Sequence, residues 1–171
     1  MAYDANAVAN HFLDMATSKG KALTPMKLQK LVYFAHGWNL ALFEEPLIDE
    51  PIQAWKFGPV VPSLYQEFKH AGNSAIVTKA TNFNFKDFEV VTPDVPESDE
   101  RTRALLDRVW NSYGKLSAID LSNLTHLPNT PWEQVMKESG PDVRNAIIPN
   151  DKIRDHFKAL ATKNRESRVG V

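Results

Sequence analysis

The segment that decides the fold reads 26-MKLQKLVYFAHGWNLALF-43. One of its faces carries apolar residues at α-helical spacing, namely Leu28, Leu31, Val32, Ala35, Trp38 and Leu42. Further apolar side chains fall on other sides of the same helix, namely Tyr33, Phe34 and Leu40. A helix that is apolar on several faces is usually contacted by neighbours all round. The segment therefore predicts a helix over about 25–43 at the centre of a domain.

Six further helices are predicted around this one. Their apolar residues repeat at helical spacing, and several begin at capping residues. The sequence from Ser117 to Asp120 resembles a capping box, and Thr130 is an N-cap candidate followed by Pro131. The predicted segments are 4–19, 63–71, about 98–113, one from Ser117, one from Thr130 and about 150–163.

Strand patterns are short and few. Residues 47–57 alternate weakly and contain Pro51, which favours at best a short edge strand. Within 76–92, Phe83 and Phe85 alternate with polar residues, as in a short hairpin or an irregular strand pair. The predicted fold is mainly α: a compact single-domain helical bundle of about seven helices around the central helix, with a minor β-hairpin or short-strand element.

The segment 55-WKFGPVVPSLYQEF-68 predicts a stiff corner between an extended stretch and a helix. Gly58 allows backbone angles that other residues resist, and Pro59 fixes the next φ. Pro62 disfavours a helical conformation at Val61 and can itself be the first helical residue. We expect the aromatic residues of the segment to pack this corner.

The composition narrows the class of protein. The 171 residues are 43% apolar, which suits one domain expected over residues 1–163, with a flexible polar tail over 164–171. The formal net charge of −1 gives no global attraction to nucleic acid or anionic membranes, and the lack of cysteine excludes disulfides and thiolate sites. No signal-peptide pattern and no apolar run of membrane-spanning length is present, so a cytoplasmic protein is expected.

Catalytic and metal-binding patterns are missing from the sequence. No two of the five histidines lie three to five residues apart, and no nucleotide-binding or nucleophile-elbow motif occurs. No catalytic residue, cofactor or metal is therefore predicted. An enzyme assembled in three dimensions, for instance a hydrolase around His126 or His36, stays an alternative.

Two features bear on nucleic-acid binding. Lysines cluster around the start of the central helix, at Lys19, Lys21, Lys27 and Lys30, and a solvated helix face accounts for them. Residues 117–135 outline a helix-turn-helix, but Trp132 and Glu133 stand where a recognition helix needs base-reading side chains. Nucleic acid is therefore an unlikely partner.

Three stretches, in this order, resemble the Panacea domain of the SocA-like antitoxin family, many of whose members are phage-associated. They read 26-MKLQKLVYFAHGW-38, 54-AWKFGPVVPSLYQEF-68 and 121-LSNLTHLPNTPW-132. The resemblance implies a mostly helical antitoxin that neutralises a cognate protein toxin, encoded next to it, by direct protein–protein binding. It also leaves two alternatives: a proteolytic adaptor that delivers a toxin to an AAA+ protease, and a phage-encoded regulatory or anti-defence binding protein.

The shared motif residues are expected to build the scaffold rather than the contact surface. They are Leu28, Leu31, Tyr33, Trp55, Gly58, Pro59, Tyr65, His126 and Trp132. Among them, His126 is expected either to bond the turn backbone or to face a groove, so it is also a candidate for partner binding.

The partner-specific surface is expected outside the motifs. The main candidates are Phe83, Phe85 and Phe88, with the acidic linker 92–100 and the basic C-terminal tail beside them. Exposed, the three phenylalanines form an adhesive patch; the alternative is that they seal the core under a loop.

Overall fold

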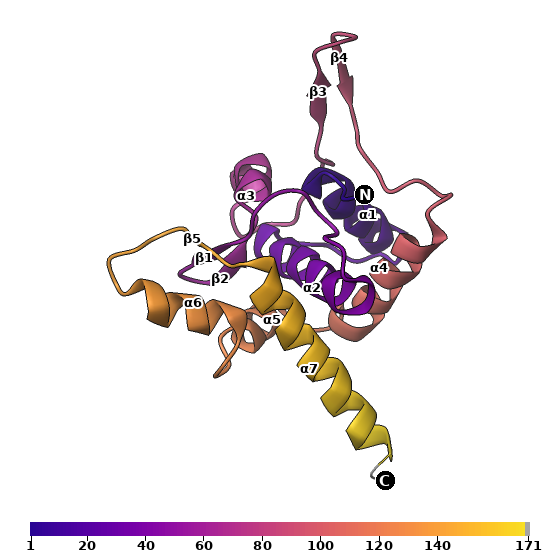
Figure 1. Cartoon of the computed structure of the whole chain (residues 1–171). Coiled ribbons are helices and arrows are strands. Elements are labelled where there is room, and N and C mark those ends of the chain that lie inside the picture. Colours follow the sequence, from indigo (N-terminus) through magenta and orange to yellow (C-terminus); the bar gives the residue numbers. More distant parts are fainter. Residues whose placement is uncertain (170–171) are drawn as a thin grey trace.

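Helix α2 (Pro25–Phe43) lies at the centre of the fold, as predicted (Figure 1). The structure is a computed structural model that describes residues 1–169. Twelve of the 19 residues of α2 are buried, and the helix contacts α1, α3, α4, α5, α7 and β2. Its only strongly exposed large apolar residue is Leu42, at 49%, so the apolar face does not reach the last turn.

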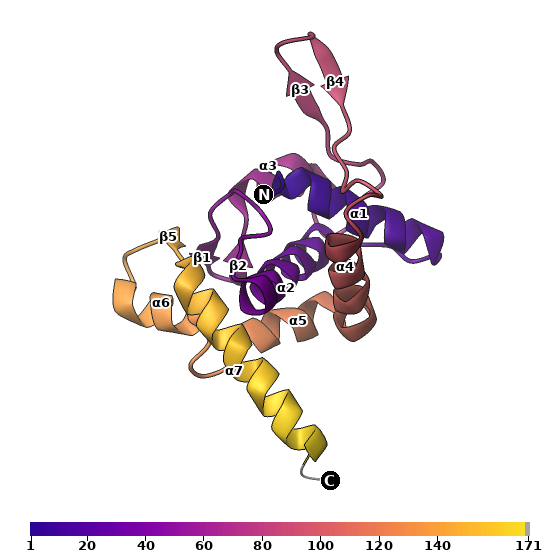
Figure 2. The same ribbon diagram turned by 45° about the vertical axis from the view of Figure 1, so that its right-hand side comes forward.

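The other six predicted helices are also confirmed within residues 1–169. They are α1 (Ala5–Ser18), α3 (Pro62–Phe68), α4 (Glu100–Tyr113), α5 (Ala118–Thr125), α6 (Pro131–Ser139) and α7 (Asn150–Val169). A short 3₁₀ helix, η1 (Lys69–Ala71), follows α3. Helix α7 continues past its predicted end at about 163 into the segment predicted as a tail, whose residues 170 and 171 lie outside the description. Its C-terminal turns extend away from the other helices (Figures 1 and 2).

Capping residues explain why several of these helices begin where they do. The Thr24 and Thr130 side chains accept hydrogen bonds from the N–H groups of Lys27 and Glu133. Ser117 and Asp120 form a reciprocal capping box at the start of α5. Each cap satisfies N–H groups that have no partner within the helix, so these boundaries were readable from local sequence.

The small sheet corrects one prediction. Strands β2 (Gly58–Val60), β1 (Gln53–Trp55) and β5 (Ala146–Ile147) form it in that order, all antiparallel, so β1 is the middle strand rather than an edge strand. Pro51 lies before the strand and blocks no ladder hydrogen bond. A separate hairpin, β3 (Asn82–Asn84) with β4 (Glu89–Val91), confirms the strand pair predicted in 76–92.

Polar side chains of α2 are buried and bond the segments around the helix. Gln29 exchanges two hydrogen bonds with the backbone of Val61, at 3.0 and 2.9 Å. Lys30 is 1% exposed, and its Nζ donates to the carbonyl oxygen of Pro59 at 3.1 Å. The prediction that Lys30 belongs to a solvated helix face was therefore wrong, because β2 and the turn before it cover this side of the helix.

The corner at 55–62 is built partly as predicted. Val61 is extended and Pro62 is the first residue of α3. The chain first reverses, however, in a two-residue turn that pairs Trp55 with Gly58 across β1 and β2. Phe57 is 58% exposed, so it does not pack the corner as expected.

Gly58 cannot carry a side chain without distorting this corner. Its φ is +116°, and an added Cβ would lie 2.8 Å from Thr125 Oγ1 and 3.0 Å from Lys30 Cε. Gly20 also has a positive φ, +64°, but nothing lies within 4 Å of its Cβ position. We expect Gly58→Ala to lower the free energy of unfolding by about 3 kcal/mol or more, and Gly20→Ala by about 1 kcal/mol. Urea denaturation measures both, and equal losses would contradict the close approach at Gly58.

Burial of Lys30 predicts a pH-dependent stability. Loss of hydration lowers its pKa from the ordinary 10.5 to about 8 in the folded protein. The unfolded chain therefore keeps a proton on Lys30 between about pH 8 and 10.5 that the folded chain has lost, and folding becomes more favourable as the pH rises through this window. Relative to Lys30→Met, the wild type should gain about 2–3 kcal/mol of unfolding free energy between pH 7 and pH 10.

Urea melts of both proteins across this pH range measure the difference, and other groups that titrate cancel in the comparison. Lys163→Met, at an exposed position on α7, serves as the control and should show no such trend. A difference in unfolding free energy between the wild type and Lys30→Met that stays constant with pH would contradict a lowered pKa of Lys30.

Candidate protein-interaction site

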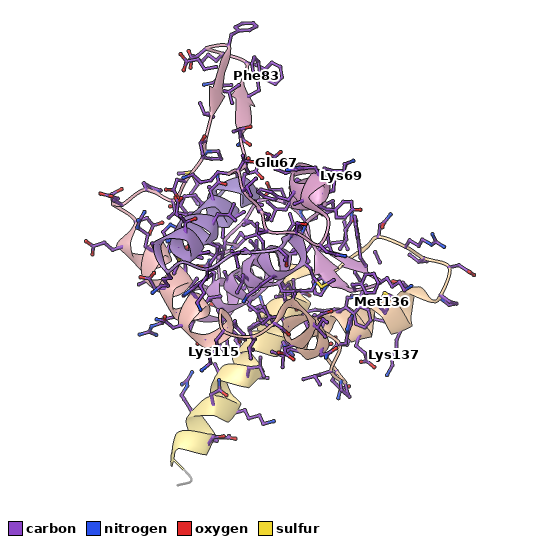
Figure 3. The ribbon with its side chains drawn as sticks, turned by 180° about the vertical axis from the view of Figure 1, so that it is seen from behind. Glu67, Lys69, Phe83, Lys115, Met136 and Lys137 are labelled. Atoms are coloured by element: carbon purple, nitrogen blue, oxygen red, sulfur yellow. The ribbon has the colours of Figure 1, made fainter. Side chains whose placement is uncertain are left out.

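The β3–β4 hairpin points away from the helices and presents aromatic side chains to solvent (Figures 1 and 2). The exposed fractions are 47% for Phe83, 78% for Phe85 and 79% for Phe88. Figure 3 shows Phe83 on the projecting part of the hairpin, well away from the helical core. The alternative in which these phenylalanines seal the core under a loop was therefore wrong.

The three rings form a small cluster of their own. The Phe83 ring centroid lies 4.8 Å from that of Phe85 and 6.2 Å from that of Phe88, both in edge-to-face geometry. Val90, opposite Phe83 in the strand register, is 68% exposed and adds apolar surface. Edge-to-face pairs of this kind hold rings in defined positions, so the hairpin offers a shaped apolar surface.

The turn at the tip of the hairpin is ordered by one side chain and strained at one residue. Asn84 Oδ1 accepts hydrogen bonds from the N–H groups of Lys86 and Asp87, and its amide donates to the Asp87 carboxylate. Phe88 has a φ of +53°, a left-handed conformation that bulky residues rarely adopt. A glycine or asparagine would fit this backbone better, so Phe88 is poorly explained by stability.

A buried side chain of α1 anchors the hairpin at its base. Asn10 is fully buried, and its amide donates to the carbonyl oxygens of Ala80 at 2.9 Å and of Pro93 at 2.8 Å. Its Oδ1 accepts from the N–H of Ala80 at 2.7 Å. One side chain thus joins the strand that enters the hairpin to the segment that leaves it.

A second set of polar contacts lies slightly further along the hairpin. Asn6 donates to Asn82 Oδ1 at 2.7 Å, and Asn82 donates to Asp4 Oδ2 at 2.9 Å. The sequence pattern does not single out these asparagines. Nothing in the periodicity of α1 distinguishes Asn6 or Asn10 from a solvated residue, because their partners lie some 70 to 80 residues away.

The shared motif residues lie mostly together under the corner between β1 and α3, apart from the hairpin. Leu28, Leu31 and Tyr33 are buried in the core. Trp132 donates its indole N–H to the carbonyl oxygen of Trp55 at 2.7 Å. This contact ties the start of α6 to the end of β1.

Tyr65 departs from the expectation of a buried scaffold residue. It is 43% exposed and meets the Trp55 ring edge-on, with ring centroids 5.0 Å apart. It lies on α3, on the solvent side of the corner.

His126 closes α5 as its C-cap residue and packs against Trp132, with ring centroids 3.9 Å apart. Its Nε2 atom is buried and has no hydrogen-bond partner among the described residues. Burial and the positive charge of Lys30 both lower the pKa of the imidazole, in that order of size. A role of His126 in partner binding stays a prediction.

His36 has a clear structural role. Its Nδ1 accepts from the N–H groups of Leu47 and Ile48, at 3.3 and 3.4 Å, so Nε2 carries the proton and donates to Asn150 Oδ1 at 2.9 Å. Burial lowers the pKa of the ring, which favours this neutral form. Both nitrogen atoms are thus engaged in joining α2 to the segment before β1 and to the start of α7.

The acidic linker 92–100 uses some of its charge within the fold. Asp99 is the N-cap of α4 and accepts a hydrogen bond from the Tyr3 hydroxyl at 2.5 Å. Burial and this bond raise the pKa of Tyr3 to about 12. Asp94 lies 3.6 Å from the ring of His11. The linker is therefore a weaker candidate for a contact surface than the hairpin.

Residues 1–169 offer neither a cluster of metal ligands nor a helix suited to span a membrane. No three His, Asp or Glu side chains gather closely enough there to hold a metal ion. No helix in that range has both the length and the apolar character needed to cross a membrane.

Comparison with known proteins identifies the family of this chain. A family model described as "Antitoxin SocA-like, Panacea domain" matches residues 28–133, which include most of α2, the corner and the hairpin. The chain is also 32% identical over 157 residues to Antitoxin SocA of Caulobacter vibrioides, covering 91% of this chain and 82% of that protein. No solved structure matches it. With most of its length covered by both matches, the chain belongs to the SocA-like Panacea family of antitoxins.

Proposed function

We propose that this antitoxin neutralises a cognate protein toxin by direct binding and that the β3–β4 hairpin makes the main contact. The observation that carries the proposal is the cluster of exposed phenylalanines on an anchored hairpin, Phe83, Phe85 and Phe88. Family membership supplies the antitoxin role, and the hairpin supplies a surface that could perform it by binding rather than by catalysis.

The physics of protein interfaces favours this surface. A few large aromatic side chains that enter pockets of a partner commonly carry most of the binding energy. Binding also costs the entropy of any loop that must become ordered, and anchoring by Asn10 and Asn84 lowers that cost in advance. The hairpin is therefore suited to insert as a preformed unit into an apolar cleft of the toxin.

The backbone at Phe88 supports the same conclusion. A bulky residue in the left-handed region costs the folded chain on the order of 1 kcal/mol, and this one buries little of its ring in return. A contact with a partner accounts for an exposed phenylalanine at a position where asparagine would be more stable.

Replacing the two most exposed rings tests the hairpin. We expect the double variant Phe85→Ser, Phe88→Asn to weaken toxin binding by about 3 kcal/mol or more, roughly 100-fold in Kd or above. Its stability should change little, because both rings are exposed and the better backbone fit of asparagine at position 88 offsets the lost edge-to-face contacts with Phe83. The measurement is binding to the purified product of the adjacent gene that is toxic when expressed alone, together with rescue of growth on co-expression.

A matched control removes two apolar side chains elsewhere. Phe57 and Ile119 are 58% and 69% exposed on other parts of the surface. The double variant Phe57→Ser, Ile119→Ser should bind and rescue like the wild type. Loss of rescue in this control, with full rescue by the hairpin variant, would show that the toxin contact lies outside the hairpin. If no adjacent gene is toxic, the antitoxin proposal itself fails.

A second candidate, an adaptor that delivers the toxin to an AAA+ protease, is favoured by the shape of α7. The helix packs on the core through Ile153, Phe157 and Leu160, and residues 162–167 beyond them are polar and exposed. Its C-terminal end projects from the body (Figure 1). An exposed terminal helix of this kind could contact a third protein while the hairpin holds the toxin.

Shortening α7 separates the two mechanisms. We expect a chain that ends at Thr162 to bind the toxin with unchanged Kd, since residues 163–167 are exposed and lie on a helix that extends away from the hairpin. Under the adaptor mechanism the toxin's half-life in cells, followed by immunoblot after translation is stopped, should rise several-fold with the shortened chain. An equal half-life with both chains, alongside full neutralisation, would leave simple sequestration.

A further inference from the structure

A basic pocket lies where the ends of three helices meet. It has a volume of about 410 Å³ and is lined by the end of α1, the loop that follows, the first turn of α2 and the end of α4. The side chains that matter there are Lys19, Lys21, Lys27, Lys115, Trp110 and Asn111. Figure 3 labels Lys115 on the side of the helical body away from Phe83, so the pocket and the hairpin are separate surfaces.

The lining of this pocket offers hydrogen-bond donors and almost no acceptors. No carboxylate is among its lining residues, and none of its four lysines forms an ion pair with another described residue. Lys27 donates to the carbonyl oxygen of Gly114 at 2.6 Å, which uses one of its three N–H groups. Three of the chain's four indoles donate hydrogen bonds within the fold, whereas the Trp110 indole has no acceptor among residues 1–169.

The position of Lys27 is electrostatically unfavourable for the isolated chain. It lies in the first turn of α2, where the helix dipole disfavours positive charge, and that turn has no acidic residue. Burial and the nearby charge of Lys21 lower the pKa of Lys27. Lys19, by contrast, lies at the C-terminus of α1, where a cation is favourable. These lysines repel one another, and an anion that enters the pocket would relieve this repulsion.

We propose that this pocket binds an acidic peptide segment of a protein partner, whose carboxylates meet the lysines and the Trp110 indole. Nucleic acid fits the pocket less well. Strand-binding sites combine basic residues with exposed aromatic faces on which bases stack, and Trp110 is only 7% exposed. The lining holds no arginine, the residue that most often reads bases, and the whole chain has a net charge of −1.

The inference extends the proposed function, since the natural source of the acidic segment would be a protein bound by this antitoxin. Carboxylates in a lysine-lined pocket contribute through charge, which speeds association and weakens with salt. The hairpin contributes through apolar contact, which depends little on salt. The two surfaces can therefore be tested apart.

The test uses the full chain and a fluorescein-labelled peptide made only of glutamate and aspartate, so that it does not depend on the toxin. We expect fluorescence anisotropy to show binding at low ionic strength. The triple variant Lys19→Gln, Lys21→Gln, Lys115→Gln should weaken it at least about tenfold. Lys27 is left in place because it bonds Gly114. The control is Lys56→Gln, Lys69→Gln, Lys163→Gln, which changes net charge equally at exposed positions outside the pocket and should bind within about twofold of the wild type.

A second readout locates the peptide. In amide and indole NMR spectra, peptide addition should shift the Trp110 indole resonance, assigned by its loss in Trp110→Phe, and leave the other three indoles in place. The melting temperature of the pocket variant should stay close to that of the wild type, because relief of the repulsion between the lysines offsets the loss of the favourable Lys19 charge at the end of α1.

Three results would overturn the inference. One is no detectable peptide binding, and another is equal weakening by the pocket and control variants, which indicates unspecific charge attraction. The third is tighter, pocket-dependent binding of a single-stranded DNA of the same length, which would assign the site to nucleic acid. Toxin binding through the hairpin is measured separately. None of these three results would therefore decide whether the proposed function is correct.

Discussion

Burial of α2 over most of its length is the constraint on which the rest of the structure depends. A helix surrounded on all sides cannot leave its polar side chains unpaired, because an unsatisfied buried polar group costs about 1–3 kcal/mol. In this chain those side chains are paired with the backbone of strand β2 and of the loops around the helix: Lys30 with Pro59, Gln29 with Val61, and His36 with Leu47 and Ile48. The central helix therefore fixes the loops as well as the hydrophobic core. It packs so closely that a Cβ on Gly37 would lie 2.2 Å from the Phe157 ring of α7.

This constraint also explains how far the fold could be predicted from sequence. Helices depend on periodicity and on capping within a few residues, so all seven were identified and the capped starts were nearly correct. What failed depends on partners distant in sequence. Lys30 looks like a solvated residue until β2 covers it, and β1 looks like an edge strand until Ala146 and Ile147 pair with it. No local window contains either partner.

In the candidate site, too, the features set by local sequence were predictable and those set by distant partners were not. The alternation of Phe83 and Phe85 with polar residues predicted a strand pair, but it could not decide between an exposed and a buried hairpin, because both have the same local pattern. The decision lies with Asn10, which fastens the two ends of the hairpin to α1 and lets the strands between them project. The sequence around Phe88 does not show that this position is unusual. Its left-handed backbone favours glycine or asparagine, yet the chain has a phenylalanine there.

The two surfaces proposed for binding, the hairpin and the basic pocket, each carry a cost in stability for the free chain. At the hairpin the cost is exposed apolar surface and one strained phenylalanine; at the pocket it is like charges gathered around the first turn of α2. These costs lie on separate sides of the helical body (Figure 3). A single partner that covers both the hairpin and the pocket must extend along the helical body. A small partner can cover only one of the two surfaces. Because α1 carries the hairpin anchor at Asn10 and one wall of the pocket at Lys19, a rigid helix sets the distance between the two surfaces. If both proposed surfaces bind one partner, that fixed distance would select partners that carry an apolar cleft and an acidic segment at matching separation.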